Sequence, residues 1–138
     1  MATINQYLFV YGTLLMSGNE FADYLQAHCK LLGQGKFKGR LYNAGEYPGA
    51  IADASTNQYV YGRIYLIDNP QKVLDVIDRY EGIGANELHP HEYTRELIKV
   101  IKDDEVITCW AYLYNWPENR LKRIAGGNYV QYINTKTK

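Results

Sequence analysis

Glu81 occupies the position in this sequence that best suits acid–base chemistry. It lies in helical phase with Leu74 and Ile77, at i, i+3 and i+7, so the three residues share the apolar stripe that should face the core. Burial in an apolar face penalises the charged form of a carboxylate, and the negative end of the helix dipole acts in the same direction. Both effects raise the pKa of Glu81 and predict a general acid or base that works near neutral pH.

The helix that would carry Glu81 has a signal at each end. Asn69 is a good N-cap, Pro70 fits the first helical turn, and Gly82 suits the left-handed residue that closes a helix. Asp75 and Asp78 lie on other faces of this helix, and we expect both to be solvated.

Other roles of Glu81 stay open on the pattern alone. Its side chain could bend into solvent, or form a structural ion pair with Arg79 or a more distant arginine, because helix ends are uncertain by a residue or two.

The remaining elements are predicted from hydrophobic periodicity and from turn residues. We expect strands at Gln6–Tyr11, within residues 33–42, and at Ala50–Ala54, Tyr59–Leu66, Tyr93–Ile101 and Val106–Trp116. A helix should begin at the capping box that Ser17 and Glu20 form, and run through His28. Loops are expected at Asn43–Gly49 and Ile83–Pro90. Gly62 indicates a bulge or a close backbone approach. Strands and helices do not alternate, which favours an α+β fold with a largely antiparallel sheet. The polar tail is expected to fray, over Thr135–Lys138 in particular.

A second candidate for chemistry is Tyr11-Gly12-Thr13-Leu14, at the end of the first predicted strand. Glycine lets the backbone turn tightly and approach a ligand, and successive N–H groups in such a turn form an anion-binding concavity. A carboxylate or a developing oxyanion would suit that concavity. An ordinary strand-to-helix turn has the same residue types, and the motif alone does not separate the two.

Composition limits the classes of protein that fit. The 138 residues are most simply one domain, residues 1–138, with 15 basic and 15 acidic side chains and no net charge. We therefore expect neither a nucleic-acid partner nor a membrane partner. With no apolar leader, Cys29 and Cys109 are expected to be reduced thiols of a cytoplasmic protein.

Metal or cysteine chemistry has little support in the sequence. His89 and His91 flank a proline without an evident third ligand, so we expect no metal and no cofactor. Cys29, near the apolar face of a predicted helix, and Cys109, in a predicted strand, are more typical of small core residues than of nucleophiles. No phosphate-binding glycine motif is present.

Taken together, these segments resemble the γ-glutamylcyclotransferase-like family, which includes the γ-glutamylamine cyclotransferases and AIG2-like proteins of the short bacterial type. The matching segments, in order, are Tyr11-Gly12-Thr13-Leu14, Tyr47-Pro48-Gly49, Val60-Tyr61-Gly62-Arg63-Ile64-Tyr65, Tyr80-Glu81-Gly82 and Tyr93-Thr94-Arg95. The resemblance covers roughly Tyr7 to Tyr129. It implies a small mixed, largely antiparallel β-barrel flanked by helices, with one cavity beside the Tyr11–Leu14 loop.

The resemblance also implies a role for each matching position. The residues Tyr11, Gly12, Thr13 and Leu14 would hold the α-carboxylate end of a γ-glutamyl group, with Tyr47 and Tyr93 also in the substrate site. Glu81 would be the catalytic carboxylate. The implied reaction is intramolecular aminolysis of a γ-glutamyl amide or amine to 5-oxoproline and a free amine, a cofactor-free acyl transfer counted among transferases or lyases.

Several points stay open at this level. A related acyl or amine transfer in the same cavity, or a non-catalytic small-ligand-binding or interaction protein of the same fold, fits the same motifs. The leaving amine is not defined, and we expect a monomer or a weak homodimer. Asn128 stands in the C-terminal glycine-rich segment, where family members often have an acidic residue, which leaves the part played by Gly126–Tyr129 in the pocket undefined.

Overall fold

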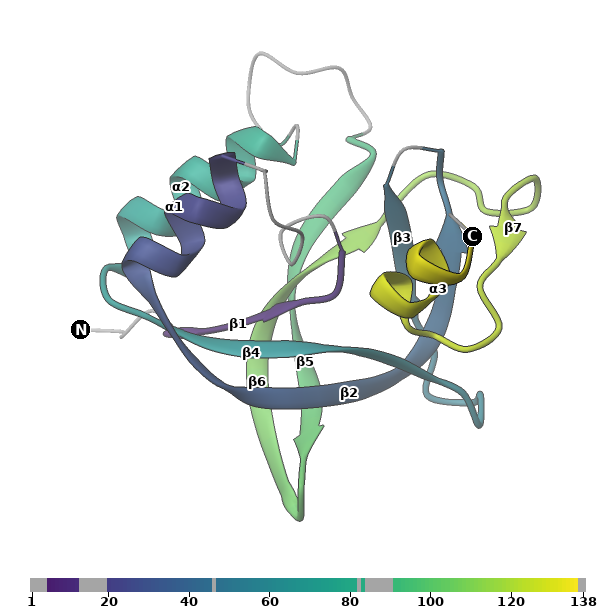
Figure 1. The fold of residues 1–138 in the computed structure, drawn as a ribbon, viewed down its shortest axis with the longest axis horizontal. Helices are drawn as coiled ribbons and strands as arrows, with labels where there is room; N and C mark the ends of the chain where they lie inside the picture. Colours follow the sequence, from purple (N-terminus) through teal and green to yellow (C-terminus); the bar gives the residue numbers. More distant parts are fainter. Residues whose placement is uncertain (1–4, 13–19, 46, 82, 84–90, 137–138) are drawn as a thin grey trace.

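The fold is a small barrel with helices on its outside (Figure 1). The structure, a computed structural model, describes residues 5–12, 20–45, 47–81, 83 and 91–136. The strands are β1 (Tyr7–Val10), β2 (Cys29–Asn43), β3 (Pro48–Ala52), β4 (Tyr59–Ile67), β5 (Tyr93–Lys102), β6 (Glu105–Tyr114) and β7 (Lys122–Arg123), and the helices are α1 (Glu20–His28), α2 (Pro70–Tyr80) and α3 (Tyr129–Lys136).

Five strands close into a mixed barrel in the order β2, β4, β1, β6, β5. The β5–β6 hairpin and the pairs β2–β4 and β1–β4 are antiparallel, whereas β1 runs parallel to β6. A single pairing between Lys36 of β2 and Ile101 of β5 closes the ring. The far half of the long strand β2 leaves the barrel and pairs with β3 and β7. The α+β barrel that the resemblance implies is confirmed.

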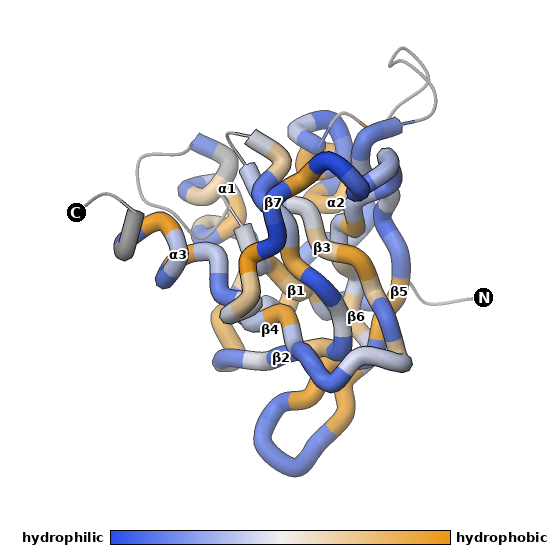
Figure 2. Tube along the Cα trace, turned by 90° about the vertical axis from the view of Figure 1, so that its right-hand side faces the viewer, coloured by the Kyte–Doolittle hydropathy of each residue, from blue (hydrophilic) through white to orange (hydrophobic). Residues whose placement is uncertain are grey.

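Alternate residues of each barrel strand enter two different cores. Phe9 of β1 packs with Val60 and Ile64 of β4 in one cluster, whereas the neighbouring Leu8 packs outward against α1 and α2. In Figure 1 these two helices lie side by side on one flank of the barrel, and α3 lies near β3 and β7. Apolar residues recur along the barrel strands in Figure 2, as expected for strands that are buried on one or both faces.

Helix α2 forms because its local signals agree. The Asn69 side chain accepts a hydrogen bond from the backbone N–H of Lys72 at 3.3 Å, and Pro70 occupies the first turn. Its apolar stripe, Val73, Leu74 and Ile77, is fully buried against the barrel, and each such side chain contributes roughly 1.5–3 kcal/mol of burial free energy.

The predicted elements are present, with three local differences. Cys29 opens β2 instead of lying on the helix before it, and Pro48 and Gly49 belong to β3 instead of a loop. At the C-terminus, where the sequence analysis expects Thr135–Lys138 to fray, helix α3 continues to Lys136. Residues 137–138, Gly82 and almost all of the predicted loop 83–90 lie outside the described residues.

The helix α3 has a cap that the sequence analysis overlooked. Asn128 accepts a hydrogen bond from the backbone N–H of Gln131 at 3.0 Å, and Tyr129 in the first turn is buried in the barrel core. Gly127 precedes it with a φ of 69°, which other residues rarely adopt. The tail is therefore held by a capped helix and a buried ring.

Gly62 provides a close approach of two strands, as its position in β4 predicts. A Cβ at this position would lie 2.8 Å from the Phe9 ring and would overlap the Val10 carbonyl oxygen. We expect Gly62→Ala to lower the free energy of unfolding by about 2–4 kcal/mol, because β1 must move to accept the methyl group. Urea denaturation measures this.

Gly126→Ala is the matched control, because nothing lies within 4 Å of the Cβ it would add. Its free energy of unfolding should stay within about 0.5 kcal/mol of the wild type. Equal stabilities of the two variants would contradict the close approach at Gly62.

Candidate active site

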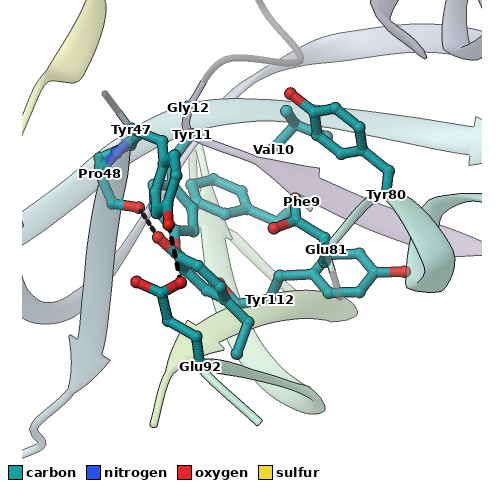
Figure 3. Close-up of a pocket in the computed structure, with 11 residues that line it drawn as sticks. Phe9, Val10, Tyr11, Gly12, Tyr47, Pro48, Tyr80, Glu81, Glu92 and Tyr112 are labelled. Atoms are coloured by element: carbon teal, nitrogen blue, oxygen red, sulfur yellow. Dashed lines mark hydrogen bonds between the residues drawn. The ribbon is translucent and has the colours of Figure 1, made fainter. Parts of the chain in front are cut away.

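A cavity of about 330 Å³ opens where β1 ends and α2 ends (Figure 3). The end of β1, the segment that leads into β3, the C-terminus of α2 and residues of β5 and β6 line it. Among the predicted site residues, the cavity brings together Tyr11, Gly12, Tyr47, Glu81 and Tyr93. Thr13 and Leu14 lie outside the described residues, so the structure does not place them.

Glu81 is the C-cap of α2, and its backbone N–H still donates to the Ile77 carbonyl at 2.9 Å. This helical bond keeps Glu81 in phase with Leu74 and Ile77, which are both buried. The side chain therefore points from the end of the apolar stripe into the cavity, as the helical spacing predicts. No described residue donates a hydrogen bond to its carboxylate.

The environment of Glu81 favours its protonated form. Burial, the negative charge of Glu92 and the negative charge of Asp78, in that order, raise the pKa of Glu81 from 4.5 to about 8. No counter-ion is paired with it within the described residues. A carboxyl group with such a pKa is mostly protonated at neutral pH and ionises in mildly basic solution, so it can both accept and donate a proton in the range where amines exchange protons.

Near Glu81, Asp78 forms a hydrogen-bonded network with Arg95 and Tyr112. Asp78, one turn earlier on α2, accepts hydrogen bonds from Arg95 Nε at 2.8 Å, from Arg95 Nη2 at 3.2 Å and from the Tyr112 hydroxyl at 2.6 Å. The Arg95 guanidinium in turn stacks over the Trp110 ring at 4.3 Å.

The expectation that Asp78 is solvated was therefore wrong, whereas Asp75 is exposed as expected. Arg95 belongs to a different strand and comes near Asp78 only in the folded chain. The spacing of Asp78 and Glu81, at i and i+3 on one helix, was the signal that could have revealed the network.

Two of the tyrosine hydroxyls at the cavity, those of Tyr11 and Tyr93, form hydrogen bonds with the backbone. Tyr11 donates to the Tyr112 carbonyl and accepts from the Ala50 N–H at 3.2 Å, and Tyr93 donates to the Pro48 carbonyl at 2.6 Å. Burial raises the pKa of both tyrosines well above the ordinary value. These hydroxyls therefore stay protonated and act as fixed walls, which leaves Glu81 as the group best suited to exchange a proton.

Gly12 stands where ring atoms crowd the end of β1. A Cβ there would lie 2.8 Å from Pro48 Cγ, so the chain can pass only without a side chain. This explains the glycine by close packing. Binding of a carboxylate by the backbone of the Tyr11–Leu14 loop stays a prediction.

In the part of the chain that the structure describes, no set of residues is arranged for metal or thiol chemistry. Within that part, no group of three or more His, Cys, Asp and Glu side chains could hold a metal ion. His91 is described, whereas His89 is not. Burial raises the pKa of Cys29 and of Cys109 to about 12, so both thiols stay protonated and unreactive.

Comparisons with known proteins agree with this fold. The model of the family described as gamma-glutamyl cyclotransferase, AIG2-like, matches residues 8–131. The chain belongs to this family. A search of curated protein sequences gave no match. Among the described residues, no helix is long and apolar enough to cross a membrane.

Solved structures of other proteins have the same fold. Protein YtfP of Escherichia coli is 30% identical, with a TM-score of 0.63 over 92% of this chain and 98% of that one. An AIG2-like protein of mouse is 24% identical, with a TM-score of 0.68 over 90% of this chain and 87% of that one. YkqA of Bacillus subtilis is 23% identical, with a TM-score of 0.71; the alignment covers 98% of this chain but only 44% of YkqA.

The raised pKa of Glu81 predicts how its replacement changes stability with pH. Between pH 4.5 and about 8 the native protein holds a proton on Glu81 that the unfolded chain has lost, so the free energy of unfolding falls as pH rises. Glu81→Gln removes this loss. The shift from 4.5 to about 8 corresponds to about 5 kcal/mol, so we expect the variant to be more stable than the wild type by up to about that amount above about pH 8, and by nearly nothing at about pH 4.

Chemical denaturation of both proteins at the two pH values measures the difference. A variant that is less stable than the wild type above pH 8 would show that Glu81 forms a structural ion pair instead.

Proposed function

We propose that this protein is a γ-glutamylcyclotransferase-type enzyme that converts a γ-glutamyl amide to 5-oxoproline and a free amine. The observation that supports it most is a carboxyl group, Glu81, held in a cavity with its pKa raised to about 8 and with no hydrogen-bond donor among the described residues. A protein that only binds a ligand gains nothing from a desolvated carboxylate, which costs stability.

The proposed reaction is an intramolecular aminolysis. The substrate's α-ammonium gives a proton to ionised Glu81, and the freed nitrogen attacks the γ-carbonyl carbon, which forms the five-membered ring and an oxyanion. Glu81 returns the proton to the leaving nitrogen as the amide C–N bond breaks. The surplus proton on the ring nitrogen passes to the released amine through solvent.

Most of the rate enhancement would come from positioning. The amine and the carbonyl belong to one flexible chain, and holding them together at reacting distance contributes several kcal/mol, up to about 7–11 in favourable intramolecular cases. Rigid walls favour such positioning, and the Tyr11 and Tyr93 hydroxyls are tied to the backbone of β3 and β6. In the proposal Tyr11, Gly12, Thr13 and Leu14 bind the α-carboxylate end through backbone N–H groups, and the Tyr47 and Tyr93 rings contact the rest of the substrate.

The proposal requires neither metal nor cofactor, because one carboxyl group can serve as base and then as acid. We therefore expect turnover to survive exhaustive chelation. Loss of activity with a chelator, restored by zinc or manganese, would point to a metal enzyme and contradict the proposed mechanism.

The test is incubation with a panel of γ-glutamyl compounds in the presence of a chelator, with mass-spectrometric detection of 5-oxoproline. Glu81→Gln keeps the shape of the side chain but cannot exchange a proton, so its rate should fall at least about 100-fold. Asp75→Asn is the matched control, because it removes an exposed carboxylate from the same helix. It should stay within about twofold of the wild type. Wild-type turnover by Glu81→Gln would refute the role of Glu81.

A second prediction concerns the network behind Glu81. The charge of Asp78 helps to raise the pKa of Glu81, and the acidic limb of kcat/KM should follow that pKa because the carboxylate must be ionised to accept a proton. Asp78→Asn removes the negative charge and leaves Arg95 in place. We expect the limb to move to lower pH, by about one unit.

Arg95→Gln is the control, because it breaks the same ion pair but keeps the negative charge of Asp78. Its limb should not move to lower pH. The ionisation of the substrate amine is common to all these profiles, so the differences between enzymes report Glu81. Equal downward shifts in both variants would indicate that the network acts only through structure.

A further inference from the structure

A second cavity, of about 410 Å³, opens between β4 and α3, beside the paired strand β2. Tyr11 is the only described residue that lines both this cavity and the one that contains Glu81. The second cavity has the size of a small-molecule site, and the proposed reaction gives it no role. Most of its lining is polar, from Gln34, Tyr61, Arg63, Asn128, Gln131 and Asn134.

The end of β1 creates the space for this cavity. The last pair between β1 and β4 joins Val10 to Arg63. Two residues earlier on β4, the backbone N–H of Tyr61 donates to the Gly127 carbonyl at 2.8 Å. The segment that leads into α3 therefore lies beside β4 where β1 no longer does, and α3 follows from that point (Figure 1). The cavity is thus a regular product of the fold between a sheet and a capped helix.

The charge around the cavity is entirely positive. Residues directly opposite each other in an antiparallel pair have their side chains on the same face of the sheet. In the pairing of β2 with β4, one such face contains three cations, two tyrosines and an amide, which are Gln34, Lys36 and Lys38 opposite Arg63, Tyr61 and Tyr59. This face has no carboxylate, and α3, which covers the other side of the cavity, contains none in its sequence.

Arg63 is the half-buried arginine without a carboxylate partner. Among the described residues, two other arginines are half-buried, and each is paired: Arg40 with Asp53 at 3.2 Å, and Arg95 with Asp78 at 2.8 Å. Arg63 forms neither an ion pair nor a hydrogen bond with any described residue, although it lines the cavity. Its guanidinium has five N–H donors in a planar fork, which matches the geometry of a carboxylate or a phosphate group.

We propose that this cavity is a second binding site, for a small organic anion that carries a carboxylate or a phosphate group. Arg63 binds the anionic group through its paired N–H donors, and the Gln34 amide, directly opposite on β2, supplies a further donor. The Tyr61 ring, which is 40% exposed, contacts the rest of the molecule. Because Glu81 does not line this cavity, the inference does not depend on the proposed function.

The test is a titration of ¹⁵N-labelled protein, followed by NMR, with three probes that share a benzene ring. Phenyl phosphate and benzoate are anions, and benzyl alcohol is neutral. At low ionic strength we expect at least one anion to bind with a Kd of about 1 mM or tighter, and benzyl alcohol to bind at least about tenfold more weakly. The stronger anion identifies the preferred group. The amide resonances of Gln34, Arg63 and Asn128 should shift, and those of Glu81 and Tyr93 should not.

Arg63→Gln should raise the Kd of the anion at least about tenfold, because it keeps a polar side chain and removes the charge and the fork. Arg63→Lys, which keeps the charge alone, should have an intermediate affinity and serves as a second variant. Lys38→Gln is the matched control, because Lys38 is an exposed cation on the same face that does not line the cavity. Its Kd should stay within about twofold of the wild type.

Three results would overturn the inference. The first is that neither anion binds up to about 10 mM, or that benzyl alcohol binds as well as they do. The second is that the shifts occur at Glu81 and Tyr93 instead. The third is that Arg63→Gln and Lys38→Gln weaken binding equally, which would show a diffuse attraction to the positive face. Binding is measured without turnover, so each of these results leaves the proposed function untouched.

Discussion

The arrangement of this site depends on the desolvation of one carboxyl group. Glu81 lies at the end of an apolar helix face, so the packing that fixes α2 on the barrel also withdraws its terminal side chain from water. Burial of the apolar stripe of α2 stabilises the fold, whereas burial of the Glu81 carboxyl group at the end of that stripe lowers the free energy of unfolding. A protein selected for stability alone would place an apolar residue there, which is why the exception indicates a function.

Hydrogen bonds between tyrosine hydroxyls and the backbone fix part of the cavity wall around Glu81. The chain contains 14 tyrosines, and Tyr11 and Tyr93 at the cavity give their hydroxyl groups to the backbone of neighbouring strands. Tyr11 alone joins the end of β1 to β6 and to β3. Because these rings cannot rotate freely, the walls are ordered before a ligand arrives, and a flexible substrate can be folded against them at little further entropic cost.

The sequence predicted well those features whose cause is local. The cap at Asn69, the proline at position 70 and the apolar stripe of α2 lie within a dozen residues, and together they locate Glu81. Asp78 was misplaced because its partner Arg95 is distant in sequence and its burial depends on β5. Glu92 was not identified because its place in the wall of the cavity is a property of the folded chain and not of a local pattern.

The same distinction holds for the fold. Individual strands follow from periodicity, whereas closure of the barrel rests on one pairing between Lys36 and Ile101, which no local pattern contains. The barrel was expected only through the family resemblance. Helix α3 had a local signal in Asn128, but its polar sequence concealed the helix.

A direct titration of Glu81 tests the central claim. In protein labelled with ¹³C at the glutamate side-chain carboxyls, the Glu81 resonance can be assigned from its absence in Glu81→Gln and followed by NMR as pH is raised. The account predicts a midpoint near 8, well above the ordinary glutamate value. A midpoint near 4.5 would show that Glu81 is solvated or paired with a cation, and would contradict the account.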